Sequence, residues 1–200
     1  MNKNDLRYRK TETNLKQAYL ALLAEHDCRT ITVSQLCTLA QCARNTFYQH
    51  YPDLETLKDH IIGEVLDEIS GAFHTTDTDL AQIDANRTRQ YVEGIIAGVT
   101  NQQETLQRLF AKDDGTFQKQ LTDVIYAQVI AGDRSLSKVA DTPVNRLNAA
   151  YLAAAVAGFI ASWLSDPEVT PAMAEQTLLA LHQPTINTST AYLTTASQKG

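Results

Sequence analysis

The chain has 200 residues, of which 44% are hydrophobic and 20% are charged, and this composition excludes a disordered or fibrous protein. Its formal net charge of −6 by itself disfavours nucleic acid as a partner, but residues 1–50 hold seven Lys and Arg against four Asp and Glu. A basic segment in front of an acidic body is suited to bind a polyanion at one end of the molecule.

Two helices are predicted at the start of the chain. Apolar residues recur at helical spacing between residues 13 and 25, which predicts an amphipathic helix that ends near Asp27. Thr32, followed by Gln35 three residues later, forms the pattern of a capping box, in which both side chains satisfy amides at a helix start. The second helix is therefore expected over residues 33–40.

The next two predicted helices complete a DNA-binding pattern. A short helix is expected over residues 44–50, where Pro52 stops it, and Asp53 then caps a long fourth helix. Two short helices joined by a tight turn, with polar residues on the second, are typical of a helix-turn-helix. In that motif the second helix enters the major groove of DNA.

The rest of the chain is also predicted to be helical, so the expected fold class is all-α. Residues 75–79 are polar turn formers and are expected to connect the front and rear parts. After Pro184 the sequence is rich in threonine and has no helical period, which predicts a mobile tail over residues 184–200. The rear helices are expected over residues 79–100, 102–111, 116–131, 143–165 and 171–182.

The stretch NTFYQHY, residues 45–51, divides into two faces at helical spacing. Phe47 and Tyr51 are expected to point inward and pack. The chemistry of the remaining side chains, and of the preceding arginine, suits hydrogen bonds to base edges or phosphates. The predicted DNA-contacting residues of this helix are Arg44, Asn45, Thr46, Tyr48, Gln49 and His50.

The segment ITVSQLCTLAQCARNTFYQHYPDLETL, with the preceding helix TNLKQAYLALLAEHDCRT, resembles the DNA-binding module of the TetR (tetracycline-repressor-like) family of bacterial transcription regulators. The resemblance implies that the six residues above occupy the contact positions of the recognition helix. It also implies phosphate contacts from Thr32 and Ser34 at the start of the second helix, and Arg9 and Lys10 are expected to add phosphate contacts before the first helix.

Three positions depart from the family pattern. Gln41 stands where the family usually has glycine in the turn, so a backbone position that favours positive φ carries a side chain. Ala43 replaces a serine that caps the recognition helix. Leu54 replaces a lysine that commonly contacts phosphate. These departures predict reduced affinity for DNA.

The rear part is expected to hold a dimer surface and an effector site. The run YLAAAVAGFIASWL, residues 151–164, presents small residues at helical spacing and resembles the family's dimer helix, which with the following helix forms a four-helix bundle across a two-fold axis. A helix buried within one chain is the alternative, and a membrane span is disfavoured. The residues expected to line an effector pocket are Tyr91, Ile95, Phe110, Phe117, Tyr126, Tyr151, Phe159 and Trp163.

No catalytic motif is found: the chain has no glycine-rich phosphate loop, nucleophile elbow or His-Glu-x-x-His sequence. Cys28, Cys37 and Cys42 lack metal-type spacing, and no signal-peptide core precedes them, so three free thiols in the cytoplasm are expected. Buried packing is favoured over a redox sensor for these cysteines. We expect neither a cofactor nor a metal, and we do not expect an enzyme.

These patterns predict an N-terminal three-helix DNA-binding domain over residues 1–53 and a helical effector-binding and dimerisation domain over residues 54–183. The predicted function is sequence-specific regulation of transcription by a homodimer on double-stranded DNA with a palindromic operator. We expect a repressor that a small-molecule or protein effector releases. The alternative is a DNA-anchored helical dimer that serves as a platform for a protein partner, without a small-molecule inducer.

Overall fold

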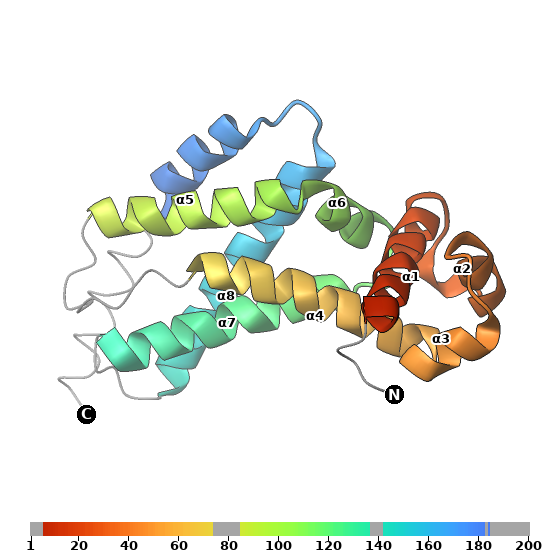
Figure 1. Ribbon diagram of the computed structural model, residues 1–200. Coiled ribbons are helices and arrows are strands. Elements are labelled where there is room, and N and C mark those ends of the chain that lie inside the picture. Colours follow the sequence, from red (N-terminus) through yellow and green to blue (C-terminus); the bar gives the residue numbers. More distant parts are fainter. Residues whose placement is uncertain (1–5, 74–84, 137–141, 183, 185–200) are drawn as a thin grey trace. The chain divides into compact units, whose positions relative to one another are not determined.

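The computed structural model describes residues 6–73, 85–136, 142–182 and 184, and every regular element in these ranges is a helix, which confirms the predicted all-α class (Figure 1). The predicted connection at 75–79 and most of the predicted tail lie outside the described residues. The elements are α1 (Leu6–Glu25), the 3₁₀ turn η1 (Cys28–Thr30), α2 (Val33–Leu39), α3 (Arg44–His50), α4 (Leu54–Phe73), α5 (Ala85–Asn101), α6 (Gln103–Lys112), α7 (Thr116–Leu136) and α8 (Pro143–Ser165), and residues 171–182 are also helical.

The chain divides into two compact units. The first contains the described residues of Met1–Val65 together with Glu104–Phe117, and the second contains those of Leu66–Gln103 and Gln118–Gly200. Most of α6 therefore belongs to the same unit as α1, α2 and α3. The predicted boundary between residues 53 and 54 separates a DNA-binding part from an effector-binding part. It stays a prediction, because the division into compact units does not identify the residues that bind DNA or an effector.

Helix α1 begins seven residues earlier than the sequence pattern indicated. Its first two turns are rich in charge and carry one buried side chain, Tyr8, which is 8% exposed. The hydroxyls of Thr11 and Thr13 donate to the carbonyls of Arg7 and Arg9 at 3.0 Å, so these polar residues are satisfied within the helix. The buried ring of Tyr8 and these bonds within the helix accompany its extension to Leu6.

The predicted capping box at the start of α2 is confirmed. The amide of Gln35 donates to the Thr32 hydroxyl at 3.3 Å, and the Gln35 side-chain oxygen accepts from the amide of Thr32 at 2.9 Å. The reciprocal pair satisfies amides that the first turn of any helix leaves open. It fixes where α2 starts, and hence where the turn into α3 falls.

The core of the first unit is made by apolar side chains from four helices. α1 contacts α2, and α2 contacts α3. Fully buried side chains on these helices and on the start of α4 fill the space between them, and they include Leu15, Leu23, Leu36, Phe47 and Leu57. Burying each of them contributes on the order of 1.5–3 kcal/mol, so α3 is held by packing although it is too short to be stable alone.

The second unit is built around α8, whose limits match the prediction because Thr142 caps it and Pro143 occupies its first turn. Among the described helices, α8 alone is long and apolar enough to cross a membrane, and 44% of its most apolar stretch is buried in the protein. Figure 1 shows residues 171–182, in blue, running beside α5, where Tyr91 and His182 stack with ring centroids 5.5 Å apart.

Candidate nucleic-acid interface

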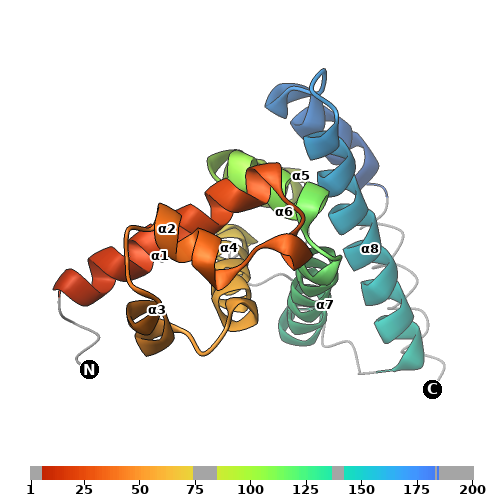
Figure 2. The same ribbon diagram turned by 90° about the vertical axis from the view of Figure 1, so that its right-hand side faces the viewer.

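Helix α3 presents two different faces, as its sequence predicted. Phe47 is fully buried and Tyr51, at its C-cap, is 4% exposed, whereas Tyr48 is 55% exposed. Arg44, Asn45 and Gln49 are also exposed, and Thr46 is half-buried. Figure 2 shows α3 directly after α2 in the first unit, with the turn between them. The helix therefore offers one row of polar groups to solvent while its aromatic side holds it to the unit.

Tyr51 ties the end of α3 to the neighbouring helices. Its hydroxyl donates to Glu12 of α1 at 3.1 Å and lies 2.9 Å from Nδ1 of His60 in α4. Because the single hydroxyl proton goes to Glu12, His60 donates through Nδ1 in this arrangement. Burial, and then the charge of Glu12, raise the pKa of Tyr51 well above its usual value, so the hydroxyl stays protonated.

The same network continues along α4. Nε2 of His60 lies 3.4 Å from Glu64, and Glu64 also accepts from Lys16 of α1 at 2.6 Å. These side chains are partly exposed, so each pair contributes little to stability on its own. Lys16 and Glu64 thus join α1 to α4, and Tyr51 connects the end of α3 to the same group of side chains.

His50 is placed differently from the expectation. Its ring stacks on Tyr8 of α1, with centroids 3.9 Å apart, and both ring nitrogens are buried without a hydrogen-bond partner. Burial lowers the pKa of His50, and the charge of Glu12 offsets only part of that effect. In the single chain the ring therefore packs α3 against α1 and turns neither nitrogen to solvent. The predicted DNA contact of His50 stays a prediction.

The other predicted phosphate-contacting residues are exposed. Arg9 and Lys10 lie within the first turns of α1 and not in an arm that precedes it, which corrects their predicted setting. Ser34 is exposed on the first turn of α2. The hydroxyl of Thr32 donates to Gln35 at 2.7 Å while it accepts in the capping box, so a phosphate contact from Thr32 would compete with that bond.

The turn between α2 and α3 has a backbone conformation that favours glycine at Gln41, and α3 lacks a side-chain cap at Ala43, as the sequence predicted. Gln41 has φ of +54°, and it is the one non-glycine residue with positive φ in the described part of the chain. Such a conformation costs a side-chain-bearing residue roughly 1–2 kcal/mol. Ala43 is the N-cap residue of α3 and makes no side-chain hydrogen bond to the helix. The next helix, α4, does have a side-chain cap, because Asp53 accepts from the amide of Thr56 at 2.7 Å.

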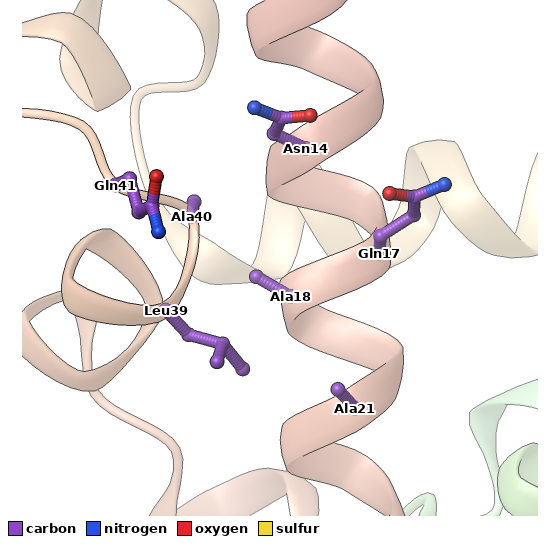
Figure 3. A pocket seen from close by; sticks show the side chains of 7 residues that line it. All are labelled: Asn14, Gln17, Ala18, Ala21, Leu39, Ala40 and Gln41. Atoms are coloured by element: carbon purple, nitrogen blue, oxygen red, sulfur yellow. The ribbon is translucent and has the colours of Figure 1, made fainter.

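A shallow hollow of about 330 Å³ lies on the first unit, between α1 and the end of α2 (Figure 3). Figure 3 shows Asn14 and Gln17 on α1, and Leu39 and Gln41 at the end of α2 and in the turn that follows. None of the predicted DNA-contacting residues lines it. The residues around it are Asn14, Gln17, Ala18, Ala21, Leu39, Ala40 and Gln41.

The three cysteines are free, as predicted. Cys37 is buried, and Cys28 and Cys42 are half-buried. Burial, and then the neighbouring Cys37, raise the pKa of the Cys42 thiol to about 11. Because the thiolate is the reactive form, this environment favours the packing interpretation over a redox sensor for Cys42.

The predicted effector-pocket residues are divided between the two units. Phe110 and Phe117 belong to the first unit, where their rings meet edge to face at 4.9 Å. Tyr151 is 63% exposed on α8, so it does not line an enclosed pocket in the single chain. Ile95 and Trp163 are buried in the second unit, and the half-buried residues there are Tyr91, Tyr126 and Phe159.

Comparison with known proteins adds to this geometry. No protein-family model matches the chain. Over 156 residues it is 23% identical to YxbF of Bacillus subtilis, an uncharacterized HTH-type transcriptional regulator. The match covers 78% of this chain but 40% of YxbF, so the chain spans about two fifths of the length of that relative.

Solved structures match over most of both chains. A TetR-family regulator from Streptomyces coelicolor superposes with a TM-score of 0.65 at 15% identity, covering 92% of this chain and 83% of that one. The fold is that of TetR-family regulators. A TetR regulator from Streptococcus agalactiae gives 0.65 at 21% identity over 86% and 93% of the two chains. NalD from Pseudomonas aeruginosa, a repressor of a multidrug efflux pump, gives 0.63 at 17% identity over 90% and 96%.

The TetR fold agrees with the resemblance found in the sequence, which rested on residues 13–57 alone. In the TetR fold of this chain, α2 and α3 are the two helices of the helix-turn-helix. The exposed polar row lies on α3, the second helix of this motif.

Proposed function

We propose that the chain is a sequence-specific DNA-binding transcription regulator of the TetR family, acting in the cytoplasm as a homodimer on a palindromic operator. The observation that carries the proposal is the division of α3 between a buried anchor, Phe47, and an exposed polar row that includes Tyr48. The TetR fold and the partial similarity to an HTH-type regulator support it.

In this proposal the exposed residues of α3 read the major groove. Arg44 suits a bidentate contact to guanine, and Asn45 and Gln49 suit adenine edges. The row holds one arginine and no lysine, so most of the attraction to the phosphate backbone of DNA has to come from nearby elements of the protein. The residues proposed for phosphate contacts are Arg9, Lys10, Thr32, Ser34 and Tyr48, and Thr46 is proposed to contact a base or phosphate through its methyl or hydroxyl group.

A homodimer accounts for an exposed apolar surface in the second unit. On α8, Leu147 and Tyr151 are 72% and 63% exposed, and Leu181 on the following helical segment is 60% exposed. A second copy that packs its own α8 and residues 171–182 here would cover these side chains. Two recognition helices about 34 Å apart would then read the two halves of a palindrome.

Repression and its release follow from a two-state scheme. An effector that binds one spacing of the recognition helices more tightly than another changes the affinity for DNA by that difference. We propose a repressor released by a small-molecule or protein effector that binds the second unit. The buried aromatic and aliphatic residues of that unit, such as Trp163 and Ile95, supply the apolar surroundings that a small ligand needs.

Selection of bound DNA from a random pool tests the proposal. The full chain is expected to enrich a single palindrome, whose binding weakens as salt rises because phosphate contacts release counterions. Failure to enrich any sequence would contradict sequence-specific regulation. If the DNA-bound dimer instead retains a protein partner and no ligand disturbs its binding, the platform alternative is favoured.

A further inference from the structure

Cys28, Asp113 and Asp114 come together in the first unit from distant parts of the chain. Cys28 opens η1, and the two aspartates follow α6. The thiol sulfur and one carboxylate oxygen from each aspartate all lie within 4.8 Å of one another. The sequence predicted no metal here, because 85 positions separate Cys28 from Asp113 and no ligand spacing is visible.

One atom of this cluster is left without a hydrogen bond. The Asp113 side chain is 2% exposed, and its Oδ2 accepts from the amide of Phe117 at 2.8 Å. Its other oxygen, Oδ1, is buried and has no hydrogen-bond partner. Because a buried carboxylate oxygen is costly to leave unsatisfied, this atom needs a cation or a donor.

Lys58 of α4 supplies only part of that charge. Its ammonium is 2.8 Å from Glu55, 3.4 Å from Asp114 and 3.8 Å from Asp113 Oδ1. The contact to Asp113 is too long for a hydrogen bond. The ammonium therefore faces three carboxylates and donates to the exposed Asp114, but it leaves the buried Oδ1 of Asp113 without a hydrogen bond.

We propose that Cys28, Asp113 and Asp114 form a binding site for a zinc-type divalent cation. Zinc accepts sulfur and carboxylate ligands in a tetrahedral set, and a water would complete it. A thiol ligand favours zinc over magnesium or calcium, which prefer oxygen. On binding, the Cys28 thiol releases its proton to solvent and the thiolate binds the ion. With Glu55 beside Lys58 included, four negative charges then face three positive ones from Zn²⁺ and the ammonium, which leaves a net charge of −1.

Such an ion would join two segments of the first unit. Cys28 lies in the link between α1 and α2, and the aspartates lie between α6 and α7. Bound zinc would hold η1 to the end of α6, and it would stabilise the unit by mass action because the unfolded chain does not hold the three ligands together. This inference does not depend on DNA binding.

The test uses the full chain freed of metal by a chelator and then titrated with zinc against a chromophoric competitor. We expect one zinc ion per chain and a higher melting temperature in its presence. Cobalt in place of zinc is expected to give a thiolate-to-metal absorption band. Cys28→Ser and Asp113→Asn should each lower zinc affinity at least about tenfold and remove the thermal shift, and Cys28→Ser should also remove the band.

Matched variants separate this site from adventitious binding. Cys42→Ser changes a cysteine outside the cluster and should keep the cobalt band and the affinity. Lys58→Met removes a competing cation and should raise zinc affinity, and zinc should restore part of the stability that this variant loses. Circular dichroism of each metal-free variant checks its folding. Absence of stoichiometric binding, or equal affinity in wild type and folded Cys28→Ser, would overturn the proposal.

Discussion

Tyr8 and His50 stack with their ring centroids 3.9 Å apart, which joins the first turns of α1 to the last residue of α3. The stack covers both nitrogens of His50, so the histidine acts on α3 by packing. It also explains why α1 extends back to Leu6 through a segment with few apolar residues. The placement of α3 thus involves a residue 42 positions earlier in the chain.

Replacing Tyr8 with alanine should destabilise the first unit and weaken operator binding together. The buried ring would leave a cavity beside His50, and removing a large buried side chain costs on the order of 3 kcal/mol. Urea unfolding measures the loss of stability, and a gel shift measures the loss of affinity. A Tyr8→Ala protein as stable as wild type would show that the stack does not hold α1 to α3.

Tyr48→Ala should weaken operator binding without a large loss of stability, because the Tyr48 side chain is 55% exposed on the face of α3 that points away from the core. Its loss should change the free energy of unfolding by less than about 0.5 kcal/mol. As the loss of a phosphate contact, it should weaken binding to the operator and to a scrambled duplex by similar factors, measured by gel shift at one salt concentration. Unchanged operator affinity in this variant would remove Tyr48 from the interface.

The free energy of unfolding should decrease as the pH is lowered below the ordinary pKa of histidine. Burial lowers the pKa of His50 in the folded protein, so the unfolded chain takes up a proton first as pH falls. The contribution of His50 is therefore complete above about pH 6.5 and is lost as pH falls through the folded-state pKa. His182 has the same direction of shift and the same cause.

The test for His50 is urea unfolding of wild type and His50→Phe at about pH 8 and about pH 5.5. Phenylalanine keeps a flat ring beside Tyr8 but cannot take a proton. The loss of stability between the two pH values should be smaller in the variant. An equal loss in both proteins would mean that His50 titrates normally in the folded state.

Gln41→Gly should stabilise the turn of the helix-turn-helix. Gln41 holds φ of +54°, which glycine adopts without strain, although glycine also makes the unfolded chain more flexible. The net gain expected is about 0.5–1 kcal/mol in the free energy of unfolding, measured by urea titration. Gln35→Gly serves as a contrast, because it removes half of the capping box and should destabilise. A loss of stability in Gln41→Gly would contradict the assigned strain.

Local signals in the sequence predicted the elements that carry the proposed function. The limits of α3 and α8 were predicted because Pro52 ends one and the pair Thr142-Pro143 starts the other. The inward positions of Phe47 and Tyr51 followed from helical spacing alone. Such features depend on neighbours a few residues apart, so a single sequence is enough to find them.

Contacts between distant residues were not predictable in the same way. Two rear helices were expected over residues 79–100 and 102–111, but α5 continues through Asn101 and α6 starts at Gln103. Lys58 is buried because carboxylates more than fifty positions later surround its ammonium. The covered ring of His50 likewise requires Tyr8, and no spacing rule relates the two residues.

The central claim is that the exposed row of α3 reads base sequence. Its most direct test is the ratio of affinities for the enriched palindrome and a scrambled duplex, compared between wild type and the Asn45→Ala/Gln49→Ala variant at one salt concentration. Wild type should prefer the palindrome by about 10³-fold or more, and the variant should lose at least about tenfold of that ratio while remaining folded. An equal ratio in the two proteins would contradict the claim.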